Sequence, residues 1–344
     1  MEKEISVQIN NNDLFKSNPN NIEYVSDLID ESYSDHTLDN SFCVFKSLNN
    51  IFYLIYSNEH FSIISYDLNN NKIINTIFKA HEYYITNFRH FLDIINKRDL
   101  LLSISADDNN IKIWDIKNLE LIFNIKEINK KGNLYSACIF NYKEELNIIA
   151  TNSNFKAEPI KIYDLKGKVI KTIKNNRDSI YFIDIYYNEN KNKIYILIGS
   201  QGYVASYDYI QDEFYHIYRE KNNNECHDSI IIYEKDIIKL IESCKDGYIR
   251  IFNFDMGTMI KRIKVSHLYL VSISLWNEEY LFVGCGDKSI KLVEINTGKI
   301  AKKLEGHKNS VVCVKKINLP NYGECLISQG YQINKIKMWS TNNN

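Results

Sequence analysis

Apolar and polar residues alternate in short segments along the chain, and many of these segments end in an aromatic residue followed by a polar or acidic one. The clearest copy is residues 110–115, Asn-Ile-Lys-Ile-Trp-Asp, which follows a polar turn. Alternation with a period of two places Ile111 and Ile113 on one face of a β-strand and Lys112 on the other. The pattern therefore predicts a turn that leads into a half-buried strand.

The pattern recurs seven times, and the position of Trp114 is the anchor of each copy. The anchors are Tyr66, Trp114, Tyr163, Tyr207, Phe252, Val293 and Trp339. Successive anchors are 48, 49, 44, 45, 41 and 46 residues apart, and a repeat of about 40–50 residues is typical of one four-stranded β-propeller blade. The spacing predicts an all-β fold, a seven-bladed β-propeller.

The last blade is expected to take its outermost strand from the other end of the chain. Only four residues follow Ser340, whereas each earlier anchor strand is followed by a further strand pattern. An open strand edge promotes aggregation, and propellers avoid it by closure. We predict that residues 22–29 pair beside the Trp339 strand and close the ring. The predicted domains are a flexible Asn-rich leader at 1–20 and the propeller at 21–344.

Composition indicates an ordinary water-soluble protein. The chain has 344 residues, 44% of them hydrophobic and 25% charged, and its net charge of −1 gives no long-range attraction to nucleic acid or anionic membranes. It contains no apolar run long enough to span a membrane and no secretory signal at its start. We therefore expect a cytoplasmic or nuclear protein, with a ciliary compartment left open.

The seven cysteines are scattered and mostly lie inside apolar strand patterns. They therefore read as small buried hydrophobic residues in a reducing compartment. Cysteine and histidine show no zinc spacing, and there is no Gly-rich phosphate loop. We predict no metal, no cofactor and no catalytic residue.

Several residues recur at fixed positions of the repeat. Trp114-Asp115 ends an anchor strand, and Gly306-His307 lies at the junction between two blades. Five of the eight histidines occupy this junction: His36, His81, His227, His267 and His307. Three blades carry an acid six residues before the anchor: Asp108, Asp246 and Asp287. In these residues the chain resembles the WD-repeat family of β-propellers.

The resemblance implies a buried chain of hydrogen bonds in each blade, from the junction His through the turn Asp and a Ser or Thr to the anchor Trp. The implied sets are His81, Asp108 and Trp114; His227 and Asp246; His267 and Asp287; and His307 with Trp339. Each set is expected to be incomplete. In the second blade Ile104 stands where the family has Ser, in the fifth and sixth Phe252 and Val293 replace the anchor Trp, and the seventh has no acid at the turn. Because the His–Asp pairs recur from blade to blade, we interpret them as structural rather than catalytic.

Cys226 and His227 could suggest a thiol nucleophile beside its base. Neighbouring residues on a strand point to opposite faces, however, so we expect these two side chains to diverge. No enzyme activity is therefore predicted.

The favoured function is a non-catalytic scaffold or adaptor that binds other proteins, within a multiprotein complex, through its loops. Tyrosines at blade junctions are the candidate contacts, because exposed aromatic residues commonly anchor protein interfaces. These are Tyr83, Tyr84, Tyr135, Tyr181 and Tyr269.

Two alternatives remain open. Basic residues on the outer strands could bind phosphoinositide or RNA, or could simply prevent edge-to-edge association; they are Lys168, Lys171, Lys174, Lys261, Arg262, Lys264, Lys299, Lys302 and Lys303. The segment Trp114-Asp115-Ile116-Lys117 resembles the box by which some WD-repeat substrate receptors dock on cullin-RING ubiquitin ligases, although the family has Arg where Lys117 stands.

Overall fold

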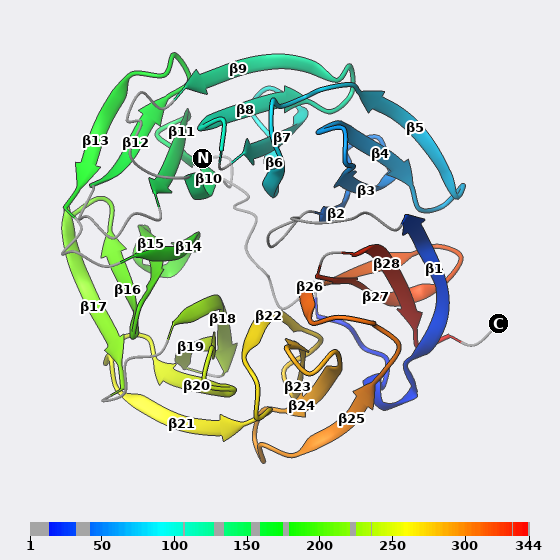
Figure 1. The fold of residues 1–344 in the computed structure, drawn as a ribbon. Helices are drawn as coiled ribbons and strands as arrows, with labels where there is room; N and C mark the ends of the chain where they lie inside the picture. Colours follow the sequence, from blue (N-terminus) through cyan, green and yellow to red (C-terminus); the bar gives the residue numbers. More distant parts are fainter. Residues whose placement is uncertain are drawn as a thin grey trace. The chain divides into compact units, whose positions relative to one another are not determined.

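Strands make up almost all of the computed structural model, which describes residues 14–31, 42–105, 107–126, 134–152, 159–174, 179–220, 225–234, 236–331 and 333–342. The strands of these ranges form seven four-stranded sheets, the seven blades of a β-propeller (Figure 1). The prediction of a seven-bladed, all-β fold is confirmed. No helix in the described ranges has the length and apolar composition needed to cross a bilayer.

The first four blades follow the chain in order. Their strands are β2 (Phe42–Lys46), β3 (Phe52–Ser57), β4 (Ile63–Asp67) and β5 (Lys72–Ile77); β6 (Ile85–Asp93), β7 (Arg98–Ser105), β8 (Asn110–Asp115) and β9 (Glu120–Lys126); β10 (Leu134–Tyr142), β11 (Glu145–Asn152), β12 (Ile160–Asp164) and β13 (Val169–Ile173); and β14 (Ile180–Asn188), β15 (Lys193–Ser200), β16 (Tyr203–Asp208) and β17 (Glu213–Arg219).

The last three blades continue the same order, except that the seventh takes its outer strand from the start of the chain. They consist of β18 (Cys226–Glu234), β19 (Ile237–Cys244), β20 (Tyr248–Asn253) and β21 (Met259–Lys264); β22 (Leu270–Leu275), β23 (Tyr280–Cys285), β24 (Ile290–Glu294) and β25 (Ile300–Leu304); and β26 (Val311–Leu319), β27 (Gly323–Gly330), β28 (Ile333–Ser340) and β1 (Glu23–Glu31).

The packing of the second blade explains the pattern of apolar residues in its strands. Ile111 and Ile113 of β8 are buried in a core cluster shared with the third blade. Trp114 and Leu101, which pair across β7 and β8, belong to a cluster shared with the first blade. Both faces of the sheet are thus covered, which is why the middle strand can carry a continuous run of leucines.

The described strands belong to two compact units. One contains blades one to three with β14 and β15, and the other contains blades five to seven with β17. Within the first unit, the inner strands β2, β6, β10 and β14 contact one another in succession; within the second, β18, β22 and β26 do so. Each unit is therefore a stack of sheets that share apolar clusters.

The strand β1 completes the seventh blade (Figure 1). It runs antiparallel to β28, with Tyr24 opposite Trp339 and Ser26 opposite Met338. Lys337 Nζ donates to Asp27 Oδ1 at 2.5 Å across this pairing. The predicted pairing of residues 22–29 beside the Trp339 strand is confirmed, with the strand beginning at Glu23.

The segment before β1 packs on the sixth and seventh blades. Phe15 is buried, with its ring centroid 4.6 Å from that of Trp276, and its N–H donates to the Trp276 carbonyl at 2.9 Å. Ser17 N–H donates to Glu324 Oε2 at 2.7 Å. The predicted leader, 1–20, lies outside the described residues up to position 13. From Leu14 onward the chain is held by these contacts.

Truncating Ile22 should destabilise the protein, because this residue is 0% exposed and shares a core cluster with Trp276 and Trp339. Ile22→Ala is expected to lower the free energy of unfolding by about 2 to 5 kcal/mol. Ile73→Ala, at a position that is 54% exposed on β5, is the control and should change it little. Chemical denaturation of the two variants makes the comparison. Equal stabilities would show that the N-terminal segment is dispensable.

Candidate functional site

A buried chain of hydrogen bonds crosses the second blade. His81 Nδ1 lies 3.0 Å from Asp108 Oδ2, and His81 Nε2 lies 2.8 Å from Ser103 Oγ. Trp114 Nε1–H donates to Ser103 Oγ at 2.9 Å. Because an ionised carboxylate only accepts hydrogen bonds, the His81 proton lies on Nδ1, and the Ser103 hydroxyl donates to Nε2.

Burial and hydrogen bonds together set the charge states of His81 and Asp108. It lowers the pKa of His81 below its ordinary value, although Asp108 works against that shift. Burial would raise the pKa of Asp108, but hydrogen bonds from His81 and from the backbone N–H groups of Asn110 and Glu82 lower it. A neutral imidazole whose two nitrogens are both occupied by protein groups stabilises the blade and leaves no face for a substrate.

The expectation that Ile104 takes the serine position was wrong by one residue. Trp114 lies opposite Leu101, so the side chains of Leu101 and Ser103 share its face of the sheet. Ile104 points to the other face, into the core shared with the third blade. The hydrogen-bonded chain of the second blade is therefore complete.

The seventh blade repeats this arrangement without the acid. Ser328 Oγ lies 2.8 Å from His307 Nε2 and accepts from Trp339 Nε1–H at 2.8 Å. Burial, with a smaller contribution from the charge of Lys337, lowers the pKa of His307 to about 4. His307 is therefore neutral in the folded protein at physiological pH.

The fifth and sixth blades do not form the pairs implied by the resemblance. His227 Nδ1 lies 2.7 Å from the Leu270 carbonyl, and Asp246 binds Arg250 instead. In the sixth blade His267 is exposed, while Asp287 accepts from Ser266 Oγ at 3.1 Å and from Lys291 Nζ at 2.6 Å. Phe252 and Val293 stand at the anchors of these blades, and neither side chain can donate to a His–Ser chain.

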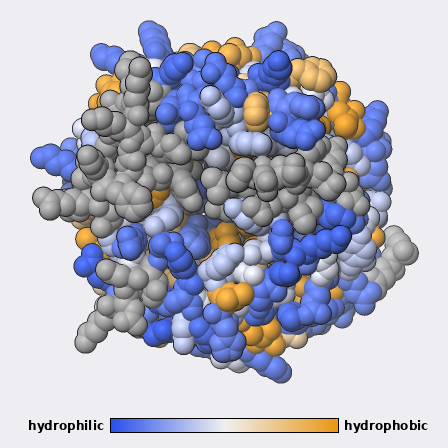
Figure 2. Space-filling model, in the orientation of Figure 1, coloured by the Kyte–Doolittle hydropathy of each residue, from blue (hydrophilic) through white to orange (hydrophobic). Residues whose placement is uncertain are grey.

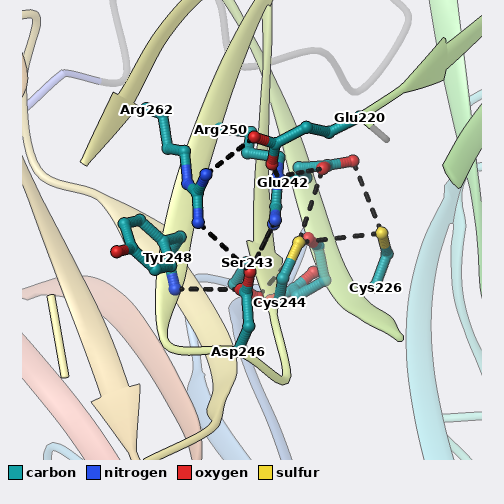
Figure 3. Close-up of polar contacts among 10 residues, drawn as sticks. Glu220, Cys226, Glu242, Ser243, Cys244, Asp246, Tyr248, Arg250 and Arg262 are labelled. Carbon is teal, nitrogen blue, oxygen red and sulfur yellow. Dashed lines mark hydrogen bonds and ion pairs between the residues drawn. The ribbon is translucent and has the colours of Figure 1, made fainter. Parts of the chain in front are cut away.

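In the fifth blade, Arg250 binds Asp246 of the turn before β20 (Figure 3). This guanidinium is buried and donates to Asp246 Oδ2 at 2.6 Å and to Glu220 Oε2 at 2.5 Å. Arg262 donates to the other oxygen of Glu220 at 2.8 Å. Two arginines thus neutralise two carboxylates, and sequence reasoning missed this network because Glu220 precedes the blade.

One further His–Asp pair lies away from the repeat positions. His90 Nε2 is 2.8 Å from Asp99 Oδ1, and its ring stacks on Phe45 at 3.8 Å between centroids. Asp99 Oδ2 accepts from Leu48 N–H at 2.9 Å. The pair therefore ties the first blade to the second, which is a structural role.

An exposed aromatic patch lies at one end of the first blade. It is formed by Phe61, between β3 and β4, and by Phe78, Tyr83 and Tyr84, between β5 and β6. The Phe61 ring meets the Tyr84 ring edge-on at 5.0 Å and lies 6.5 Å from that of Tyr83. Phe78 is 80% exposed and Tyr83 is 48% exposed.

Phe61 and Phe78 were missed by the sequence analysis. Phe61 has a left-handed backbone (φ 58°), which is rare for a bulky residue and has no sequence signal here. Such strain persists only where the surroundings hold it, and here the Phe61 carbonyl accepts from His81 N–H at 3.3 Å. The His81 segment therefore helps to present the aromatic ring at the surface.

Two of the other predicted tyrosines belong to other blades. Tyr269 is partly exposed in the other unit, where its hydroxyl lies 2.7 Å from Ser310 Oγ and its ring covers Gly286. Tyr181 is half-buried on β14. The side chain of Tyr135, and His36 entirely, lie outside the described residues.

Other exposed apolar residues lie outside this patch. On the face that Figure 2 draws, hydrophobic residues form small patches among hydrophilic ones. Several belong to outer strands, including Ile73, Leu121, Ile170, Ile217 and Ile260. Scattered exposed apolar residues of this kind are normal for a folded protein.

Most basic residues of the outer strands are engaged within the protein. Lys171 Nζ donates to the Tyr209 carbonyl and lies 2.8 Å from Asp212 Oδ1. Lys302 Nζ donates to the Asn20 and Ile22 carbonyls at 2.9 and 2.6 Å. Protein acceptors also bind Lys261, Arg262, Lys264 and Lys303. These contacts favour the structural interpretation over a phosphate-binding surface.

The segment that resembles a ubiquitin-ligase docking box is partly buried. Trp114 and Ile116 lie in the core, and the Asp115 carboxylate accepts from Lys117 N–H at 2.9 Å. Only Asp115 and Lys117 reach the surface here. Docking on a cullin-RING ligase stays a prediction.

Removing the Ser103 hydroxyl should destabilise the second blade, because two buried partners, His81 and Trp114, would each lose a hydrogen bond. Ser103→Ala is expected to cost about 1 to 3 kcal/mol in free energy of unfolding. Ser105→Ala is the matched control, since Ser105 is buried on the same strand and its hydroxyl has no hydrogen-bond partner in the structure. Denaturant titration would contradict the assignment if both variants lost equal stability.

His307 should make stability depend on pH between its unfolded and folded pKa values. Below pH 6.5 the unfolded chain binds a proton that the folded chain excludes until about pH 4, so stability falls as the pH falls through this window. At pH 5 the loss from this group is about 2 kcal/mol. His307→Gln should flatten the fall of Tm from pH 7 to pH 4.5, whereas His60→Gln, at an exposed site, should leave it unchanged. Parallel curves for His307→Gln and the unsubstituted protein would refute the neutral state.

No model of a known protein family matches the chain. The chain is similar to a curated protein of Dictyostelium discoideum, "WD repeat domain-containing protein 83 homolog", with 29% identity over 97 residues. The match covers 28% of this chain and 29% of that relative's length. The seven four-stranded sheets make the chain a β-propeller, and over the matched stretch it is similar to a WD-repeat protein.

Proposed function

We propose that this WD-repeat propeller is a non-catalytic scaffold, and that the aromatic patch of Phe61, Phe78, Tyr83 and Tyr84 is a binding site for a protein partner. The observation that carries the proposal is the group of aromatic rings at one end of the first blade, in which Phe78 and Tyr83 are exposed and the half-buried Phe61 contacts the rings of Tyr83 and Tyr84. Large, rigid aromatic side chains supply most of the affinity at many protein interfaces.

Topology gathers the patch from two separate loops. In an antiparallel sheet the turn after the second strand and the connection after the fourth strand lie at the same end. The β3–β4 turn therefore brings Phe61 beside the β5–β6 connection, which carries the other three residues. Loops positioned by a rigid sheet are a common place for binding sites.

The geometry supports a binding role rather than catalysis. Both nitrogens of His81 are occupied by protein groups, and His90 and Asp99 are likewise used between blades. These groups have protein partners where an acid–base mechanism would need contact with a substrate. The name of the Dictyostelium relative mentions WD repeats and no reaction, which agrees with a scaffold.

We further propose that the scaffold works in a reducing, intracellular compartment, cytoplasmic or nuclear. All seven cysteines are buried and none forms a disulfide. Proteins of oxidising compartments typically use paired cysteines as disulfides.

The double variant Phe78→Ala/Tyr83→Ala should weaken partner capture at least tenfold, because two exposed interface rings are lost while the core is untouched. The measurement is quantitative mass spectrometry of proteins that co-purify with the tagged full chain from its own cells. Phe214→Ala, which removes a ring that is 41% exposed on β17, is the control and should capture as the unsubstituted chain does. The patch is not the binding site if the double variant retains full capture, and the melting temperature of each protein must be checked in parallel.

A further inference from the structure

Two cysteines and a glutamate meet inside the fifth blade (Figure 3). Cys226 of β18 lies directly opposite Cys244 of β19 in the antiparallel register. Glu242 is two residues before Cys244, so its side chain lies on the same face of the sheet. Strand pairing therefore brings together three side chains from distant positions, which explains why no sequence spacing revealed the cluster.

The three groups are close together and buried. Cys226 Sγ lies 3.7 Å from Cys244 Sγ. Cys226 Sγ is 3.5 Å from Glu242 Oε2, and Cys244 Sγ is 3.4 Å from Glu242 Oε1. All three side chains are almost wholly removed from solvent.

These separations are close to those of ligands around one tetrahedral ion. With Zn–S bonds of about 2.3 Å and a Zn–O bond of about 2.0 Å, tetrahedral angles place two sulfur atoms about 3.8 Å apart and a sulfur and an oxygen about 3.5 Å apart. Each sulfur lies at this distance from a different oxygen of Glu242, and one ligand atom from each of the three residues lies within 4.8 Å of the other two. The side chains would need little rearrangement to bind such an ion. Among the residues that the structure describes, this is the one group of three that has ligand atoms at this spacing.

The charge around the cluster also favours a cation. Glu242 is 2% exposed, and the nearest guanidinium nitrogen, Arg250 Nε, is 4.0 Å from Glu242 Oε1. Arg250 gives its hydrogen bonds to Glu220 and Asp246, which it shares with Arg262. Two arginines and two carboxylates already balance, so Glu242 is the additional carboxylate. In the described part of the chain, the donors within hydrogen-bond distance of it are the two S–H groups, which are weak donors. A buried charge of this kind is costly unless it is paired or binds a metal.

The donor set selects the metal. Thiolates bind Zn²⁺ well and Mg²⁺ or Ca²⁺ poorly, while a carboxylate is a less suitable ligand for Cu⁺. We propose that the fifth blade binds one Zn²⁺ through Cys226 Sγ, Cys244 Sγ and the Glu242 carboxylate. The ion would exchange water ligands for two thiolate sulfurs and one carboxylate oxygen, with release of the two thiol protons, and would keep one water molecule as its fourth ligand. The resulting site has a net charge of −1, beside the cationic Arg250.

The role of this zinc would be structural. It would join the first residue of β18 to the last residue of β19, at the end of the hairpin remote from its turn. Because the cluster is buried and lies in a different blade from the aromatic patch, the inference is independent of the proposed partner binding.

The test uses the full chain, purified in reducing buffer without chelator. We expect about one zinc per chain by inductively coupled plasma mass spectrometry. After metal removal, Co²⁺ should restore one equivalent, with thiolate-to-cobalt charge-transfer absorption in the near ultraviolet and intense visible bands of a tetrahedral ion. Cys244→Ser should lower the zinc affinity at least 100-fold and weaken the charge-transfer band, and Glu242→Gln should lower the affinity while the sulfur band persists.

Cys285→Ser is the matched control, because Cys285 is also a buried cysteine at the end of a strand, β23, and should bind zinc as the unsubstituted chain does. The proposal is overturned if the reduced, unsubstituted chain binds neither zinc nor Co²⁺, a result that does not depend on any variant folding. It is equally overturned if peptide mapping shows a Cys226–Cys244 disulfide in a chain that binds no metal after reduction.

Discussion

Every sheet described here has two apolar faces, and the need to cover both determines the rest of the structure. In the second blade, Trp114 packs toward the first blade while Ile111 and Ile113 pack toward the third. At about 25 cal/mol per Å² of apolar surface removed from water, this stacking is the largest favourable contribution to folding. A polar group in such a stack must find its partner among protein groups of its own blade or the next one, which is the physical reason for the His–Ser–Trp chain.

The architecture could be predicted from the sequence because the same strand pattern recurs seven times. The anchor at Trp114 and the open edge beside Trp339 were enough to predict the blade count and the pairing of β1 with β28, and both are confirmed. The serine partner was placed one residue too late, at Ile104 instead of Ser103. The sequence of one strand does not determine its register against the neighbouring strand. A shift of one residue exchanges the two faces of the sheet.

The sites were harder to predict because they depend on contacts between segments far apart in the chain. Junction tyrosines were chosen by position, but exposure and ring contacts connect only Tyr83 and Tyr84, and they do so through Phe61, which has no repeat signal. Likewise Asp246, for which a pair with His227 was implied, binds Arg250, which also binds Glu220. Cys226 and Cys244 become neighbours only through the β18–β19 register. Repetition thus reveals the common framework, whereas the candidate sites depend on residues that depart from it.

The pairing of the first strand with the last also sets an order of events during synthesis. Tyr24 leaves the ribosome long before its partner Trp339, and at about 5 to 20 residues per second the interval is roughly 15 to 60 s. Throughout this time the backbone donors and acceptors of the early strand have no native partner. The nascent chain therefore carries an unpaired strand until the segment with Trp339 has been synthesised, and an open strand edge promotes aggregation.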